Sequence, residues 1–212
     1  MKKFTLIASV AFLFAFSSCV KDAATGTGSI NFQLKALVSP VNGAAITWTA
    51  GSAGVASTKI EAKKNDAAVE FKAEPNSQVD LFGAVNISNV AVPAGTFRSV
   101  EFSSELQPLS GKPALHLEGT YTAGGVTTPI SFDVNTAITV KSKRDSIVIA
   151  ASSAYSASTS VGLVTLTQDV TEADLKAADR TSGKIIISST SNIPVYTKMF
   201  ANLGKTQVVD FH

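Results

Sequence analysis

The chain has 212 residues, with 18 lysines and arginines against 16 aspartates and glutamates, and it contains one cysteine. A single cysteine excludes an intrachain disulfide, so the fold has to be held by its apolar core. Because the charges nearly balance and form no basic stripe, we expect no nucleic-acid partner.

The first 18 residues predict an export signal. Lys2 and Lys3 give a basic start, an apolar run covers residues 4–16, and small residues precede Cys19. A secretory signal has this layout, whereas a transmembrane helix needs about 20 apolar residues. The segment resembles a bacterial lipoprotein signal, which is cleaved before a cysteine that then carries lipid. The alternative is an ordinary signal peptide followed by a chance cysteine.

The lipoprotein interpretation sets the expected address of the chain. It implies that residues 1–18 are the signal, that Cys19 is the lipid-attachment residue, and that residues 19–29 form a flexible tether. We therefore expect a lipid-anchored protein of the outer membrane that faces either the periplasm or the cell surface. The pair Lys21-Asp22 resembles a weak surface-export signal of Bacteroidota lipoproteins, and an ordinary solvated tether is the alternative.

Beyond the tether, short runs in which apolar and polar residues alternate predict strands that are buried on one face. These runs contain residues 30–34, 46–48, 69–71, 79–81, 100–102, 115–121, 130–134, 138–140 and 147–149. Turn signals rich in Pro and Gly separate them at residues 40–43, 75–76, 93–95, 111–113 and 124–125. Many short strands at regular spacing predict a mainly β protein, an antiparallel β-sandwich.

The C-terminal part predicts one or two short helices. Residues 171–174 resemble a capping box and start a helix that ends near Arg180. A strand of three isoleucines follows at 184–188. A second helix, with Asn192 as its cap and Gly204 at its end, presents an apolar face at helical spacing. Residues 208–211 predict a closing strand, and the Ser-rich segment 152–160 predicts an exposed loop. We expect a single domain over 30–212 with a C-terminal helical annex.

One stretch of the chain carries a resemblance to a known group of proteins. Its pattern is a Val-Asp-Leu strand, a Pro-Ala-Gly turn before an aromatic residue, and an alternating strand, at residues 78–81, 92–97 and 100–102. This order is similar to that of uncharacterised Bacteroidota lipoproteins with a prealbumin-like or immunoglobulin-like β-sandwich. The resemblance implies the fold and the address, and it assigns no catalytic residue.

The sequence offers few groups for catalysis. His116 lies on the polar face of a predicted strand and His212 is the last residue, so we expect no metal site, no cofactor and no catalytic residue. Trp48, Tyr121 and Tyr155 are the candidates for ligand contact, although the position of Trp48 beside Ile46 favours the core. The triplet at 145–147 resembles the Bacteroidota O-glycosylation pattern, with Ser146 as acceptor, and a chance match is the alternative.

These observations favour a non-catalytic, membrane-anchored module of the cell envelope. We expect it to bind a glycan or a protein partner, or to serve an envelope complex as an accessory. One alternative is a fimbrial or pilus-like subunit, although related subunits are processed after an arginine and the first arginine here is Arg98, inside the domain. Another alternative is a glycan-acting hydrolase, which would require two carboxylates facing each other across a cleft.

Overall fold

The computed structural model describes residues 26–37, 46–83, 85–205 and 207–212, and it confirms a mainly β fold with a sandwich architecture. The strands are β1 (Thr27–Leu37), β2 (Ile46–Lys64), β3 (Ala67–Ala73), β4 (Ser77–Asp80), β5 (Asn86–Pro93), β6 (Gly95–Leu106), β7 (Leu115–Ala123), β8 (Val126–Val134), β9 (Ile138–Ile149), β10 (Ala154–Gly162), β11 (Arg180–Thr181), β12 (Lys184–Ile187) and β13 (Gln207–Phe211). The helices are α1 (Leu163–Leu166), α2 (Glu172–Ala177) and α3 (Ile193–Leu203).

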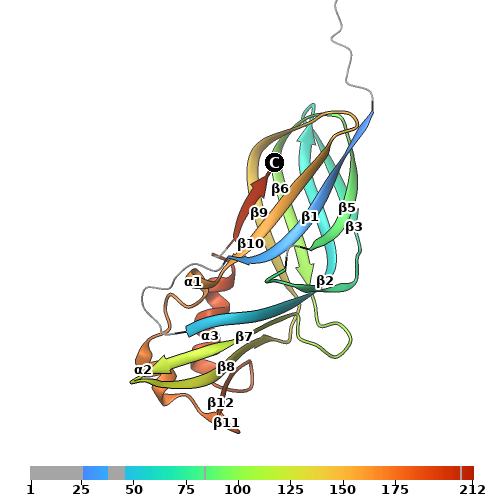
Figure 1. The fold of residues 1–212 in the computed structure, drawn as a ribbon. Coiled ribbons are helices and arrows are strands. Elements are labelled where there is room, and N and C mark those ends of the chain that lie inside the picture. The colour runs from blue at the N-terminus through green and yellow to red at the C-terminus, as the bar shows by residue number, and fades with distance from the viewer. Residues whose placement is uncertain (1–25, 38–45, 84, 206) are drawn as a thin grey trace, which may run out of the picture.

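Two sheets face each other in the upper half of the molecule (Figure 1). A four-stranded sheet in the order β13-β10-β1-β5 packs against β3, β2, β6 and β9. The core between them is rich in phenylalanine, and the rings of Phe32 and Phe102 meet edge to face with centroids 6.2 Å apart. Phe97, the aromatic residue after the Pro-Ala-Gly turn, is buried as expected and meets Phe71 in the same way.

The long strand β2 joins the two halves of the molecule. Its first half pairs with β7, and its second half pairs with β6, along the same edge. One sheet therefore continues from β9 in the upper half to β12 and β11 in the lower half. The three helices lie in the lower half, where Val195 and Met199 of α3 join a core cluster with Leu117 and Phe132 of the sheet. Because the sheet is continuous, residues 46–64 belong to both halves.

Both sheets are mixed, which differs from the antiparallel arrangement that we expected. β1 pairs in parallel with β10, and β12 pairs in parallel with β8. A parallel pair needs a crossover connection rather than a hairpin. Here the chain crosses from β9 in one sheet to β10 in the other. It then passes through α1 and α2 before β12 pairs near the edge of the lower sheet.

The expectation of a loop at residues 152–160 is wrong, since most of this segment forms β10. Ala157, Ser158 and Thr159 are buried one after another, between the neighbouring strands β1 and β13. These small side chains are covered on both faces of the strand, so the alternation that identifies a half-buried strand is absent. Residues 138–149 form one strand, so Lys143 and Arg144 lie within β9 and not in a turn.

The C-terminal helices form close to the predicted positions. Thr171 caps α2 as predicted, because its hydroxyl accepts a bond from the Asp174 amide at 3.2 Å and the Asp174 carboxylate accepts one from the Thr171 amide at 2.8 Å. Asn192 precedes α3 but does not cap it with its side chain. Its amide group instead binds the backbone of Asp179 and Ile186, which ties the helix start to β12.

The N-terminal predictions fall partly outside the part of the chain that the structure describes. The signal segment, Cys19 and the predicted turn at 40–43 are among the residues that it does not cover. β1 begins at Thr27, so the last three residues of the predicted tether belong to the sheet. Within β1, Ile30, Phe32 and Leu34 are buried on the core face, as their alternation predicts.

Candidate functional site

The outward side chains of β3, β2, β6 and β9 form rows that run across the strands, one mainly basic and the next mainly acidic. Paired residues of antiparallel strands point to the same face, so the register places them side by side. A basic row contains Lys72, Lys59, Ser103 and Lys141. The next row contains Glu70, Glu61, Glu101 and Lys143. On the other side of the basic row lie Ser57, Glu105 and Thr139. We call this surface the striped face.

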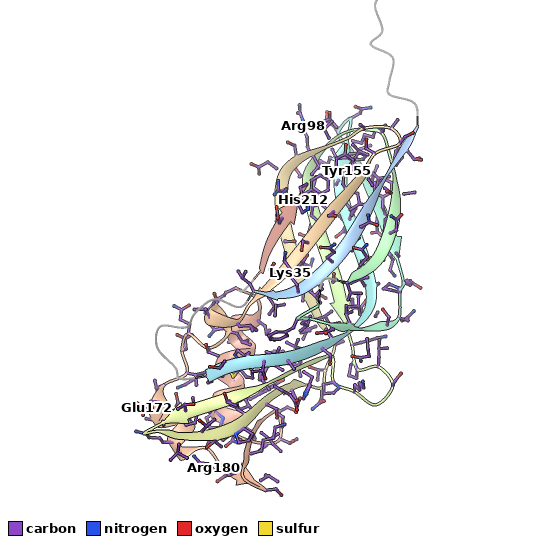
Figure 2. All side chains as sticks on the ribbon, in the orientation of Figure 1. Lys35, Arg98, Tyr155, Glu172, Arg180 and His212 are labelled. Carbon is purple, nitrogen blue, oxygen red and sulfur yellow. The ribbon has the colours of Figure 1, made fainter. Side chains whose placement is uncertain are left out.

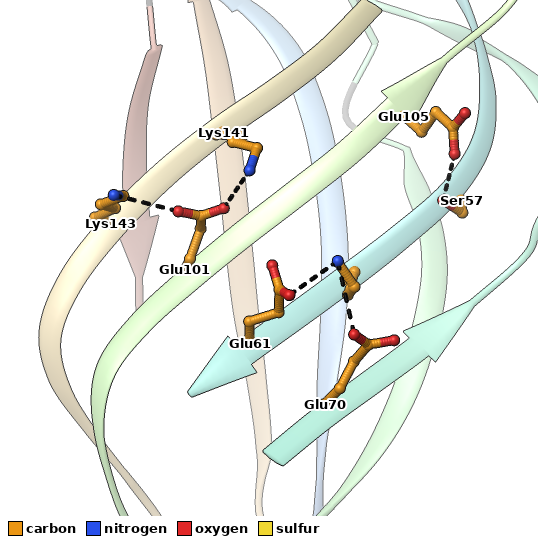
Figure 3. Close-up of polar contacts among 8 residues, drawn as sticks. Ser57, Glu61, Glu70, Glu101, Glu105, Lys141 and Lys143 are labelled. Carbon is orange, nitrogen blue, oxygen red and sulfur yellow. Dashed lines mark hydrogen bonds and ion pairs between the residues drawn. The ribbon is translucent and has the colours of Figure 1, made fainter. Parts of the chain in front are cut away.

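Ion pairs join the rows of the striped face (Figure 3). The Lys59 Nζ atom lies 3.1 Å from a carboxylate oxygen of Glu61 and 3.7 Å from one of Glu70. Glu101 accepts the Lys141 ammonium at 2.7 Å and lies 3.3 Å from Lys143. The hydrogen bond from Lys141 is the main reason that the pKa of Glu101 lies below its ordinary value. Exposed pairs of this kind add little stability, because solvent and salt screen them.

A polar hollow lies in the striped face, with a volume of about 250 Å³. Ser57 and Ser103, which are only 8% and 6% exposed, line it with hydroxyl groups, as does the exposed Thr139. Its charged lining residues are Lys59, Glu70, Lys72, Glu105 and Lys141. No aromatic residue lines the hollow. It therefore suits a polar ligand that accepts and donates hydrogen bonds, and it offers no platform for stacking a sugar ring.

A second polar row crosses the outward face of the lower sheet. Ser52, His116 and Asp133 lie opposite one another on β2, β7 and β8. The His116 Nδ1 atom lies 2.5 Å from Asp133, and Nε2 lies 3.4 Å from a carboxylate oxygen of Glu118. The hydrogen bond to Asp133 raises the pKa of His116 above its ordinary value. His116 is thus on the polar face of a strand, as predicted.

This second row does not form a catalytic triad. In a triad the histidine Nε2 receives the proton of the serine, and here Nε2 faces the Glu118 carboxylate at 3.4 Å. No hydrogen bond joins Ser52 to His116 in the described part of the chain. Glu118 also accepts a hydrogen bond from Lys184 at 3.0 Å, so the cluster is a network of ion pairs on the sheet surface.

Two of the three aromatic candidates for ligand contact are buried in the core, and the third, Tyr155, is partly buried against it. Trp48 is 5% exposed, which confirms the core position favoured by its neighbours. Tyr121 is 2% exposed, so its prediction as an exposed contact is wrong. Tyr155 lies in β10 and not in a loop; its ring stacks on Phe211 at 5.4 Å, and its hydroxyl accepts a bond from the Ala150 amide. Trp48 and Tyr121 are therefore buried, and Tyr155 is partly exposed.

Ser146 is exposed on β9, opposite Arg98 of β6. The sequence predicted separate strands at 138–140 and 147–149, whereas Ser146 lies inside one strand that covers both. The side chain is nevertheless accessible, which O-glycosylation would require. The modification itself remains a prediction.

The striped face was not predicted from the sequence. Its signal is alternation of charge at every second residue, as in Lys59, Glu61 and Lys63 of β2 and in Glu70 and Lys72 of β3. Such alternation predicts a solvated strand face. Only the register between four strands shows that like charges align in rows.

Comparison of the chain with known proteins gives no match to a protein-family model, to a curated protein or to a solved structure. Among the described helices, none is both long and apolar enough to cross a membrane. No group of three or more His, Cys, Asp or Glu side chains in the described ranges is placed to hold a metal ion. The site therefore has to be interpreted from its own chemistry.

Proposed function

We propose that the chain is a non-catalytic envelope protein, anchored by lipid on Cys19, that binds a polar and charged ligand on the striped face. The ligand is a glycan that carries charge or a polar segment of an envelope protein. The observation that carries this proposal is the hollow that hydroxyl groups and the side chains of lysine and glutamate line together. The anchor rests on the lipoprotein-like start of the sequence.

The electrostatics of the surface favour binding over hydrolysis. A glycosidase needs one carboxylic acid whose pKa is raised, so that it can protonate the leaving group. The shifts in carboxyl pKa are downward at Glu74, Glu101, Glu118 and Asp174, and the main cause in each is a hydrogen bond from lysine. Of these four, Glu101 belongs to the striped face, and its ionised carboxylate suits the recognition of a charged ligand there. The pilus-like alternative gains no support from Arg98, which lies inside β6 between two paired strands.

A binding screen against charged and neutral glycans and envelope proteins tests the proposal. The soluble protein would begin at Val20, so that every described element is retained. We expect a charged ligand to bind the wild type and to bind a Lys59→Gln/Lys141→Gln variant at least tenfold more weakly. Lys176→Gln on α2 removes one exposed lysine far from the striped face and should leave binding unchanged. Equal affinity of all three proteins would place the ligand elsewhere.

The anchor is tested separately. Mass spectrometry of the mature N-terminus should find lipid on Cys19, and Cys19→Ser should move the protein from the membrane fraction to the soluble fraction. An intact, unmodified thiol at Cys19 in the mature protein would contradict the anchor and leave the ligand-binding proposal to its own test.

A further inference from the structure

Two cations stand directly opposite each other at the upper end of the striped face. Lys63 of β2 pairs with Arg98 of β6, and both side chains are exposed. Like charges that face each other across a strand pair are destabilising. Within the described residues, neither Lys63 nor Arg98 makes an ion pair, whereas Lys59, Lys141 and Lys143 all contact glutamates. An anion bound between the two side chains would remove this repulsion.

A second hollow, of about 480 Å³, lies at these two residues. Asn65, Thr96 and Ser99 line it with groups that donate hydrogen bonds, and Asp66 is the one acid in its lining. Ser99 has a φ of 50°, and the β2–β6 register shifts beside it, so a bulge sets the direction of Arg98. The hollow thus combines two cations with neutral donors.

The neighbouring lysine does not take part in this site. The Lys64 Nζ atom donates to the Ala94 carbonyl at 2.8 Å and lies 5.3 Å from the centre of the Phe97 ring. It is held on the inner side of the strand. The positive charge at the hollow therefore comes from Lys63 and Arg98.

The hollow is at the end of the sandwich where β1 begins. The Ala94 amide, just before β6, donates to the Gly26 carbonyl at 2.8 Å, and Figure 2 places Arg98 at this end of the molecule. Gly26 follows Cys19 by seven residues in the sequence. Seven residues span at most about 25 Å. A lipid on Cys19 would therefore keep this end of the sandwich close to the membrane surface.

We propose that Lys63 and Arg98 form a binding site for a phosphate group, and that the headgroups of anionic phospholipids are the source that its position favours. The guanidinium fork of Arg98 can hold two phosphate oxygens, and the Lys63 ammonium adds a point charge. The headgroup source rests on the lipid anchor proposed above. The phosphate site itself rests only on the two cations and the hollow.

Inorganic phosphate is the first probe, added to the protein that begins at Val20. We expect phosphate to raise the Tm of the wild type by several degrees, since a ligand that binds only the folded state stabilises it. Arg98→Gln and Lys63→Gln should each raise the Tm without phosphate, because they remove the repulsion, and should lose most of the phosphate response. Asp66→Asn should increase the response. Lys112→Gln, a surface lysine outside the hollow, is the matched control and should respond as the wild type does.

Vesicles are the second probe and identify the source of the phosphate. Vesicles that contain phosphatidylglycerol should bind the wild type at least tenfold more tightly than phosphatidylcholine vesicles, and Arg98→Gln should remove that preference. A response to inorganic phosphate without a vesicle preference would support the site and reject the headgroup source. A response that is absent, or equal in the wild type and Arg98→Gln, would overturn the proposal. Cys19 lipidation is measured independently, so failure of the anchor is distinguishable.

Discussion

The His116–Asp133 pair predicts that the protein loses stability as the pH rises through and above neutrality. The pKa of His116 is raised in the folded protein, mainly by its hydrogen bond to Asp133. The unfolded chain has the ordinary histidine pKa of about 6.5. The folded state therefore binds the proton more tightly, and the contribution to stability is complete below the unfolded pKa. It is lost as the pH rises through the folded pKa.

The size of this contribution follows from the contact. A hydrogen bond to a charged group contributes about 1.5–3 kcal/mol. The side chains of His116 and Asp133 are 30% and 20% exposed, so solvent screens the pair and we expect about 1 kcal/mol. For a domain of this size, that free energy corresponds to a change in Tm of about 2–4 °C.

Urea denaturation of the wild type and Asp133→Asn at pH 5.5 and pH 9 measures the effect. We expect the substitution to lower the free energy of unfolding by about 1 kcal/mol at pH 5.5 and by clearly less at pH 9. His212→Gln is the control, because His212 is 68% exposed and lies 3.6 Å from its nearest carboxylate. An equal cost of Asp133→Asn at both pH values would refute the assignment of the charged imidazole to this pair.

Three further predictions concern the helical annex and the join between the two halves. Asp174→Asn should destabilise the protein by about 1 kcal/mol at pH 7, since the carboxylate caps α2 and holds Lys198 at 2.7 Å. The pKa of Asp174 is lowered to about 2, so the cost should shrink in denaturation curves as the pH falls from about 4 toward 2. Gly119→Ala should cost about 1–3 kcal/mol, because a Cβ would lie 2.3 Å from the Thr47 carbonyl oxygen. Gly204→Ala, in open space with helical backbone angles, should be neutral or stabilising by up to about 1 kcal/mol. Urea denaturation measures both glycine variants.

Sequence periodicity predicted the strands that bury one face and failed where both faces are buried. In β1, large apolar residues alternate with polar ones, so the core face is visible in the sequence. In β10, Ser158 and Thr159 are as buried as Ala157, and small polar residues carry no such signal. The same alternation along a strand would have placed Tyr121 on the buried face. It follows Leu117 by four residues on β7 and therefore shares its buried face.

The candidate site could not be predicted from the sequence for a different reason. The strands β2 and β3 show charge alternation in their sequences, but a shift of one residue in any pairing would turn that strand's charges to the other face. The bulge at Ser99 makes such a shift between β2 and β6. Without the register, the sequence does not show that Arg98 lies opposite Lys63, or which residues of the four strands lie side by side.

The order of the rows explains why the uncompensated charge lies at one end of the striped face. Along β2, Glu61 separates Lys59 from Lys63, and its carboxylate contacts Lys59. In the same acidic row, Glu101 contacts two lysines of β9. The carboxylates of Glu61 and Glu101 are therefore paired with cations other than Lys63 and Arg98. The next residues beyond this cationic pair belong to the β2–β3 turn and the start of β6, where Asp66 is the one acid in the hollow's lining. A bound anion would supply the missing negative charge beside Lys63 and Arg98. These two residues lie at the end of the sandwich where β1 begins, which follows Cys19 in the sequence.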